Sequence, residues 1–386
     1  MQNKITARIL FVAHSIGCGG AERSLNEILR ALLCVGRFEL GVVYPEEDGV
    51  AGAGCLEEFS QSVKLYHMSY PWWISWNANN RVERRKHDRY ILKLIYRSIQ
   101  PAISILKDFR PDIVVTNTSI IPTFAIASKI KRIPHCWFVR ESVTNTLGLR
   151  FLFRDTLSYF LIGKLSDIVF VNSWYIYSEL STCVPLKKLK VVYQAVDKTT
   201  STIGSGFNKL VCLVAGNVRP LKGQEEVIEA FRLLDPDRFV LKIAGNCSSS
   251  YANSLKNRAP QNVQFLGEVQ DMDSLYKEID VLIIGSMEAY GRTAIEAMIR
   301  HIPVIYTKKG AGPELIKDGW NGYLYEPGCI SDLVQCVLKL ESKEERERIG
   351  NNGYEFVERN CNKEKMIEDI VNPMYEIIVK RNKSTV

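Results

Sequence analysis

The chain has 386 residues, of which 46% are hydrophobic and 24% charged, with a formal net charge of +7. This length exceeds one ordinary hydrophobic core and predicts about two domains, at roughly 100–200 residues each. The composition excludes a disordered, collagen-like or coiled-coil chain. The positive charge suits an enzyme that meets anionic substrates or an anionic membrane surface. It does not indicate nucleic-acid binding, and we expect no nucleic-acid partner.

Targeting and redox features predict a cytoplasmic protein. The ten cysteines are scattered without a C-x-x-C pair, which favours reduced thiols over a metal site or a disulfide framework. The first residues run straight into a strand pattern, so we expect no cleaved signal peptide. The most apolar stretch, residues 156–174, is interrupted by Lys164 and Asp167. We therefore expect no transmembrane helix.

The first half of the chain alternates apolar runs with amphipathic segments. Residues 9–13 (ILFVA) form a continuous apolar run, as in a strand buried on both faces, and a glycine-rich turn and helical spacing over 22–33 follow. Further strands are predicted at 40–44, 113–116, 136–139 and 168–171. Alternating strands and helices predict a mostly parallel sheet covered by helices on both faces.

The same pattern then restarts. After a predicted strand at 191–193, the polar segment 198–208 is rich in Gly, Ser and Thr, as expected of a linker. The second series of predicted strands is 210–215, 239–244, 263–266, 281–284 and 304–306. We therefore predict an α/β fold of two doubly wound, Rossmann-like domains. Ligands of such sheets bind at the carboxyl ends of the strands, so the cleft between the domains is the expected site.

The segment 286–296 (SMEAYGRTAIE) is the most informative motif. A predicted strand delivers Glu288 to a loop, Gly291 allows close approach of the backbone to a ligand, and a helix begins near it. Arg292 and Glu296 are i,i+4 neighbours on one helix face. Two carboxylates eight positions apart can bind hydroxyls at separate points of one ligand, and a carboxylate suits a ribose diol. The alternative is an N-capping glutamate plus a surface salt bridge.

The segment 213–225 (LVAGNVRPLKGQE) predicts a strand, a turn with two cations, and a helix. Arg219 and Lys222 would repel each other beside a helix N-terminus unless an anion lies between them, which suits a diphosphate. The segment lacks the Walker pattern G-x-x-x-x-G-K-[ST]. The alternative is a pair of solvated loop cations.

The segment 13–22 (AHSIGCGGAE) follows the first predicted strand. Its glycines, including Gly19 and Gly20, allow close approach of a ligand, but the G-x-G-x-x-G fingerprint of dinucleotide-binding domains is absent. His14 stands alone after the strand, and a lone histidine there is more often structural than catalytic.

These three segments, in this order and in two halves, resemble the retaining glycosyltransferases of family 4, which have the GT-B fold. Residues 286–327 resemble the E-x7-E region of that family and the P-V-I…G…E-L-I…G-x-N-G-x-L run that follows it. The resemblance extends over nearly the whole chain, and it is loose between residues 51 and 107. It implies an acceptor-binding domain at 1–197, a nucleotide-sugar-binding domain at 198–365, and a C-terminal helix at 366–386 that crosses back to the first domain.

The resemblance implies a role for each matching residue. Glu288 would face the donor sugar, Glu296 would hold the ribose hydroxyls, and Lys222 would bind the diphosphate. The remaining donor-binding positions implied by it are Gly19, Gly20, Asn217, Arg219, Glu268, Val269, Ala289, Tyr290, Gly291, Arg292 and Thr293. The family's usual arginine falls at Asn217, and Arg219 is the candidate to supply that charge.

The N-terminal half departs from the family at the positions after its middle strands. Many relatives have histidines there, whereas this chain has Asn117, Arg140 and Glu141. We expect all three on the acceptor side of the site. Arg140 and Glu141 are predicted catalytic residues, together with Glu288 and Lys222. Arg140 would bind a phosphate, or Glu141 would bind a sugar hydroxyl. The alternative is a buried structural ion pair.

Two further segments bear on metal binding and on membrane binding. The sequence Asp271-Met272-Asp273 precedes a predicted helix, where an aspartate is an ordinary cap, so we predict neither a metal nor another cofactor. Residues 81–97 hold seven Lys or Arg and two Asp or Glu, close to the aromatic run at 70–76. This pairing suits an anionic membrane surface on the inner face of the cell membrane. The alternative is a helix with a solvated basic face.

The sequence therefore predicts a glycosyltransferase that moves a sugar from a nucleotide-sugar, with uridine favoured by family frequency, to a glycan or polyprenyl-linked acceptor. The resemblance implies retention of anomeric configuration and a role in cell-surface polysaccharide synthesis. The alternatives are another GT-B enzyme, such as a sugar-nucleotide epimerase or a phosphorylase, and a non-catalytic nucleotide-sugar-binding partner subunit.

Overall fold

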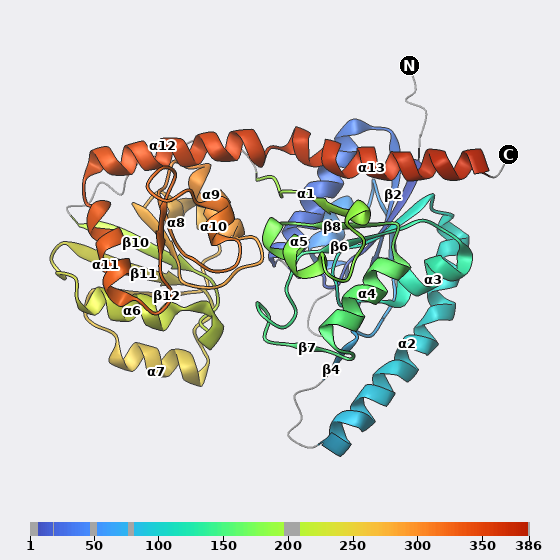
Figure 1. The fold of residues 1–386 in the computed structure, drawn as a ribbon, viewed down its shortest axis with the longest axis horizontal. Helices are drawn as coiled ribbons and strands as arrows, with labels where there is room; N and C mark the ends of the chain where they lie inside the picture. The colour runs from blue at the N-terminus through green and yellow to red at the C-terminus, as the bar shows by residue number, and fades with distance from the viewer. Residues whose placement is uncertain (1–6, 18, 47–51, 76–80, 197–208, 385–386) are drawn as a thin grey trace. The chain divides into compact units, whose positions relative to one another are not determined.

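The computed structural model describes residues 7–17, 19–46, 52–75, 81–196 and 209–384 (Figure 1). The predicted linker at 198–208, Cys18 of the glycine-rich turn and Trp76 of the aromatic run lie outside the described residues. Backbone contacts divide the chain into two units. Unit 1 comprises residues 1–195 and 363–386, and unit 2 comprises residues 196–362.

Unit 1 is built on a seven-stranded parallel sheet of order β3-β2-β1-β5-β6-β8-β9. Its strands are β1 (Ala7–Val12), β2 (Phe38–Tyr44), β3 (Lys64–His67), β5 (Ile113–Thr116), β6 (His135–Val139), β8 (Ile168–Val171) and β9 (Leu189–Val191). A separate antiparallel pair joins β4 (Ile74–Ser75) to β7 (Arg150–Phe151). The α-helices of unit 1 are α1 (Gly20–Val35), α2 (Arg81–Phe109), α3 (Thr123–Lys131), α4 (Asp155–Leu165), α5 (Trp174–Leu180) and α13 (Lys363–Ser384).

Unit 2 is built on a six-stranded parallel sheet of order β12-β11-β10-β13-β14-β15. Its strands are β10 (Leu210–Ala215), β11 (Phe239–Ala244), β12 (Val263–Gly267), β13 (Val281–Ile284), β14 (Val304–Thr307) and β15 (Tyr323–Tyr325). Its α-helices are α6 (Gln224–Arg232), α7 (Ser250–Arg258), α8 (Met272–Tyr276), α9 (Arg292–Met298), α10 (Gly312–Leu315), α11 (Ile330–Lys339) and α12 (Lys343–Asn360).

The continuous apolar runs become strands because parallel strands are covered on both faces. Every residue of β5, β6, β8, β13 and β14 is buried. Inside the first sheet, His135 is buried beside Thr116, whose hydroxyl lies 2.8 Å from its Nε2. Burial lowers the pKa of His135 to about 3, because the charged imidazolium would lose its hydration there.

The last helix, α13, belongs to unit 1 although it follows the whole of unit 2 in the chain. Its residues Met366, Ile370, Met374 and Ile378 are buried in the same hydrophobic cluster as β1 and α1. The spacing of four between them places them on one helix face. Met366 also receives a hydrogen bond at its sulfur from the backbone N–H of Ala195, at 3.4 Å.

The strand order creates one switch point in each sheet. In unit 1 the chain runs outward from β1 through β2 to β3 and then returns to β5 on the other side of β1. In unit 2 it runs from β10 through β11 to β12 and returns to β13 beside β10. The two loops leaving such neighbouring strands diverge, and ligands of doubly wound sheets bind there. In the described part of the chain, no helix is long and apolar enough to span a membrane.

Candidate functional site

Lys222 and Glu288 meet at the switch point of unit 2. Lys222 ends the short 3₁₀ turn Pro220–Lys222 after β10, and Glu288 lies in the loop after β13. Their side chains form an ion pair with 2.5 Å between Nζ and Oε1. Both side chains are partly exposed, at 29% and 26%. A cation and a carboxylate predicted from separate motifs therefore occupy one place, accessible to a ligand.

Glycines allow the two loops to approach this closely. Gly223 has φ 68°, in the left-handed region, and it begins α6. A Cβ added to Gly223 would lie 2.3 Å from the carbonyl oxygen of Gly285. The backbones of the two loops are thus in direct contact, and a side chain at position 223 would separate them.

Neighbouring groups hold Glu288 in position. The Ser286 hydroxyl donates a hydrogen bond to Oε1 of Glu288, the same oxygen that Lys222 contacts. The Glu288 carbonyl accepts from the backbone N–H of Ala311 at 3.0 Å. Gly310, with φ 59°, lies so close that a Cβ there would come within 2.3 Å of the same carbonyl. The sequence motif did not identify Ser286, although its spacing of two from Glu288 along an extended loop is compatible with this contact.

Glu296 projects from α9 and is held from two sides. The Arg292 Nε donates to Oε1 at 2.8 Å, a salt bridge of the kind named in the alternative interpretation of this motif, and the Tyr276 hydroxyl donates to Oε2 at 3.2 Å. Burial raises the pKa of Tyr276 well above its usual range, and the Glu296 carboxylate adds to the effect. The phenol therefore stays protonated and remains a donor. The sequence did not point to Tyr276, because a tyrosine in a short amphipathic helix has no special signature.

The loop between the two glutamates offers a ligand its backbone more than its side chains. Ala289 and Tyr290 are buried, and the Tyr290 hydroxyl contacts Cys361 Sγ at 3.5 Å. Thr293 is partly exposed in the first turn of α9. Gly291 has φ 82°, and a Cβ there would come within 2.7 Å of the Tyr306 hydroxyl. Burial, with a contribution from the Glu288 carboxylate, raises the pKa of Tyr306 well above its usual range.

The remaining residues predicted to bind the donor lie in neighbouring loops. The Asn217 side-chain oxygen accepts from the backbone N–H of Asn246 at 3.1 Å, and the Asn246 amide donates to Glu268 at 2.8 Å. These bonds connect the loops after β10, β11 and β12. Asn217 therefore acts as a connector of loops and carries no charge. Arg219 is exposed beside it and Val269 is partly exposed.

At the switch point of unit 1, Arg140 and Asn117 form a buried polar chain. The Arg140 Nε donates to the Asn117 side-chain oxygen at 2.9 Å, and the Asn117 amide donates to the carbonyl of Ala21 at 3.2 Å. The guanidinium lies 4.0 Å from the centre of the Phe138 ring. Arg140 and Asn117 are 6% and 1% exposed. The Arg140 backbone N–H donates to Oε2 of Glu141 at 3.2 Å.

Glu141 accepts several hydrogen bonds from the loop after β5. Its Oε1 receives the Thr118 hydroxyl at 2.8 Å and both the backbone N–H and hydroxyl of Ser119 at 2.8 and 2.7 Å. A carboxylate with this many donors is well compensated for its partial burial. This geometry favours a role in shaping the loop, and the predicted catalytic roles of Arg140 and Glu141 stay predictions.

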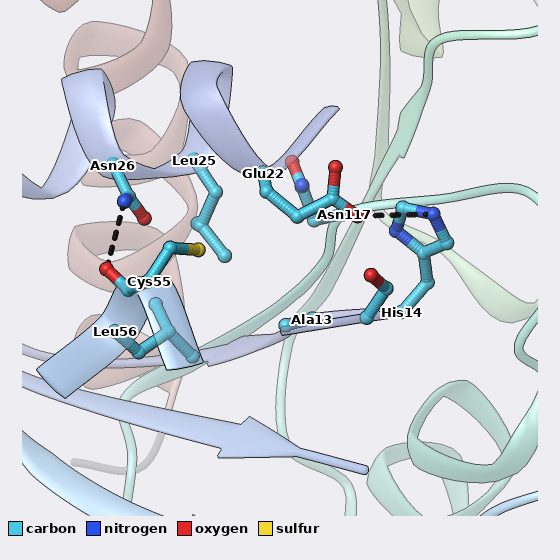
Figure 2. A pocket seen from close by; sticks show the side chains of 9 residues that line it. Ala13, His14, Glu22, Leu25, Asn26, Cys55, Leu56 and Asn117 are labelled. Carbon is cyan, nitrogen blue, oxygen red and sulfur yellow. Dashed lines mark hydrogen bonds and ion pairs between the residues drawn. The ribbon is translucent and has the colours of Figure 1, made fainter. Parts of the chain in front are cut away.

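The turn after β1 carries the predicted glycines. Gly19 caps α1 and Gly20 begins it. His14, which the sequence left as a lone histidine, pairs with Glu22 of α1 at 3.3 Å between Nε2 and Oε1. Figure 2 shows the two side chains pointing toward each other in a small pocket that Asn117 also lines. The sequence did not predict this pair.

Asp271 caps a helix, as predicted. Its Oδ1 accepts from the backbone N–H of Ser274 at 3.0 Å at the start of α8. Among the described residues, no group of three or more His, Cys, Asp or Glu side chains is arranged to hold a metal ion. The expectation of metal-independent activity stays a prediction.

Comparisons with known proteins agree with this architecture. Residues 18–200 match the family model described as glycosyltransferase family 4, and residues 198–356 match the model described as glycosyl transferases group 1. Among solved structures, HepE of Anabaena in complex with UDP and glucose has a TM-score of 0.71 at 20% identity, covering 98% of this chain and 100% of that chain. A glycosyltransferase from Rickettsia africae has a TM-score of 0.75 at 21% identity, covering 97% and 99%.

Curated relatives match over part of their length. An uncharacterized glycosyltransferase of Methanocaldococcus jannaschii is 29% identical over 195 residues, 50% of this chain and 54% of its own length. The N-acetyl-alpha-D-glucosaminyl L-malate synthase of Bacillus anthracis is 25% identical over 230 residues, 55% of this chain and 60% of its own length. The matches thus span about half the length of the curated relatives.

Two doubly wound parallel sheets, with this likeness to solved glycosyltransferases, define the GT-B class. The two family models together extend over most of the chain. The protein belongs to glycosyltransferase family 4.

Proposed function

We propose that this chain transfers a sugar from a nucleotide-sugar donor to a glycan or lipid-linked acceptor, with retention of anomeric configuration. The observation that carries the proposal is the group of residues at the β10–β13 switch point. A lysine on the loop after β10, a carboxylate paired with it on the loop after β13, and a second carboxylate on α9 held by Arg292 and Tyr276 all belong to unit 2. Such groups suit the diphosphate, the sugar and the ribose of one ligand.

Donor binding would break the Lys222–Glu288 ion pair, because the phosphates of the donor would take the place of the Glu288 carboxylate beside Lys222. In this proposal Lys222 moves from Glu288 to the diphosphate, and Glu288 then binds hydroxyls of the donor sugar. Glu296 binds the ribose diol. HepE of Anabaena was solved with UDP and glucose, which supports UDP as the nucleotide for this chain.

The chemical step breaks the bond between the sugar C1 and the diphosphate oxygen and forms the bond between C1 and the acceptor oxygen. The transition state resembles an oxocarbenium ion, and negative charge grows on the leaving diphosphate. Lys222, assisted by Arg219, stabilises that charge. The acceptor hydroxyl attacks from the side of the leaving group, and its proton passes to the phosphate. No side chain is proposed as a covalent nucleophile, and no metal is proposed.

The biological setting is proposed from relatives and from one helix. A capsular polysaccharide biosynthesis glycosyltransferase of Staphylococcus aureus is 26% identical over 175 residues, which supports cell-surface polysaccharide synthesis. Helix α2 extends away from the sheet of unit 1 (Figure 1). Its exposed residues include cations and large apolar side chains: Val82, Arg85, Lys86, Arg89, Tyr90, Leu92, Lys93, Tyr96 and Arg97. We propose that this mixed face binds an anionic membrane on the cytoplasmic side, near a polyprenyl-linked acceptor.

The donor site is tested with the purified chain and a panel of nucleotide sugars. Lys222→Ala and Glu288→Gln should each lower turnover about 100-fold or more, the scale of a lost transition-state contact. Lys242→Ala is the matched control, because Lys242 forms a similar pair with Glu278 at 2.7 Å and has no proposed role. Near-native turnover in both site variants would refute the site.

The same assay separates the alternatives. Product made by the chain alone excludes a non-catalytic partner subunit, and NMR of the new glycosidic bond reports the anomeric configuration. An inverted product would contradict retention. Conversion of the nucleotide sugar to its epimer without an acceptor would favour the epimerase alternative.

A further inference from the structure

We propose that His14, Glu22 and Trp72 form a subsite for a sugar ring of the acceptor at the carboxyl end of β1. This inference rests on the proposed function and specifies a part of it: the acceptor presents a pyranose ring to unit 1. The proposed donor site in unit 2 does not use these three residues.

The first observation is the histidine–glutamate pair (Figure 2). The Glu22 carboxylate is nearly buried, with 7% of its side chain exposed, whereas the His14 side chain is 22% exposed. A carboxylate only accepts hydrogen bonds, so the Nε2 of His14 carries the hydrogen of this contact. In the neutral imidazole the Nδ1 then keeps its lone pair. Glu22 is thus a positioning residue, and the Nδ1 of His14 can contact a sugar hydroxyl, as an acceptor in the neutral imidazole and as a donor in the imidazolium.

The second observation is an aromatic ring beside that pair. Trp72 is 41% exposed, and the centres of its ring and the His14 ring are 6.1 Å apart. Exposing an indole of this size leaves a large apolar surface in water. A single exposed tryptophan is common in proteins, so its significance here depends on how it is held.

The segment that carries Trp72 is anchored on both sides. The Tyr70 hydroxyl donates to the carbonyl of Ala13, the residue before His14. Trp73 donates from its indole to the carbonyl of Ser119 at 2.8 Å and stacks on Trp137 at 5.6 Å. Buried neighbours therefore fix the backbone at Trp72 relative to His14. The ring is presented on a rigid support, as binding sites require.

The chemistry of these groups favours a sugar over a lipid chain. A pyranose has one face of C–H groups, which fits the electron-rich face of an indole, and a rim of hydroxyls, which can reach an imidazole nitrogen. A lipid chain on Trp72 would remove water from the His14–Glu22 pair and offer it no hydrogen bond, which is costly. The same pairing of an aromatic face with few convergent polar groups is typical of small-molecule sites.

Saturation-transfer NMR on the full chain with UDP present tests the subsite. The probes are the methyl glycosides of glucose, galactose and N-acetylglucosamine. We expect transfer to the ring C–H protons of at least one glycoside, a decrease of about fivefold or more in Trp72→Ala, and partial recovery in Trp72→Phe. Trp174→Ala is the control, because Trp174 is 56% exposed at the start of α5 and is not part of the subsite.

A second measurement separates this subsite from the donor site. Calorimetry should give equal UDP affinity in the wild type and in Trp72→Ala. Failure of the wild type to bind UDP would contradict the proposed function itself. If UDP binds but no glycoside receives saturation, or if Trp174→Ala loses the signal while Trp72→Ala keeps it, the subsite is wrong.

Discussion

Tyr276→Phe isolates one hydrogen bond that orients the predicted ribose ligand. The change removes the hydroxyl that donates to Glu296 Oε2 at 3.2 Å and keeps the buried ring, over which Arg300 lies at 4.7 Å. A hydrogen bond to a charged group contributes about 1.5–3 kcal/mol. Arg292 still holds the other oxygen at 2.8 Å, so we expect the lower part of that range. Because this bond also forms without ligand, only its effect on the orientation of Glu296 changes binding, and the affinity for UDP should fall by at most about 10-fold.

Titration calorimetry with UDP measures this effect, and a second tyrosine provides the control. Tyr323 donates to Glu345 of α12 in the same unit, so Tyr323→Phe removes a similar bond away from the proposed site. Its UDP affinity should equal that of the wild type.

A double-mutant cycle identifies the route of the effect. Glu296→Ala should weaken UDP binding more than Tyr276→Phe, because the ribose then loses its carboxylate. In the Glu296→Ala background, Tyr276→Phe should have no further effect, since the hydroxyl acts only through Glu296. Additive losses would mean that Tyr276 affects binding in another way, and unchanged affinity in both single variants would refute the ribose role of Glu296.

Three further predictions concern stability and membrane binding. The folded pKa of His135, about 3, is below its unfolded value, so acid favours unfolding. The unfolding free energy should fall by about 1.4 kcal/mol per pH unit from pH 6 to pH 4. Urea titrations of His135→Gln at the same pH values should show a smaller fall, because the variant lacks the contribution of this imidazole. Gly223→Ala should lower the melting temperature at least twice as much as Gly319→Ala: both have φ near 68°, but only Gly223 also meets a carbonyl oxygen. Equal shifts would refute the close contact. Replacing Arg85 and Lys86 by Gln should weaken binding to anionic liposomes about tenfold or more, and unchanged binding would favour a solvated face.

The buried strands were the easiest features to predict. The strands expected at 113–116, 168–171, 210–215, 239–244 and 281–284 are confirmed to the residue. Continuous apolar runs mark a strand that is covered on both faces, and little else in a short segment produces them. The strand β3 was missed because it lies at the sheet edge, where its residues are partly or fully exposed and mix polar with apolar types.

The candidate site was predictable where a motif carries it. Glu288, Lys222 and Glu296 stood out because charged residues and glycines follow predicted strands, and the structure brings Glu288 and Lys222 together. The supporting contacts were not predictable. Tyr276 reaches Glu296 from another helix, and such a contact depends on packing that no local pattern encodes.

In the N-terminal half, too, the contacts of charged side chains could not be predicted from the sequence. Its charged residues were read as partners of a ligand or of each other, yet Glu141 accepts its hydrogen bonds from Thr118 and Ser119, and Arg140 donates to Asn117. The pairing of His14 with Glu22 was equally hidden, because a spacing of eight that crosses from a turn into a helix has no fixed geometry in sequence.

The placement of α13 has a consequence for how the polypeptide matures on the ribosome. The cluster of unit 1 that holds β1 and α1 needs side chains encoded more than 300 positions after β1 begins, including Ile370 and Met374. During synthesis, the second sheet is fully translated before α13 can cover the apolar surface of the first sheet. Nascent chains stopped before residue 363 should therefore expose that surface and recruit chaperones, whereas release of the finished polypeptide ends the exposure.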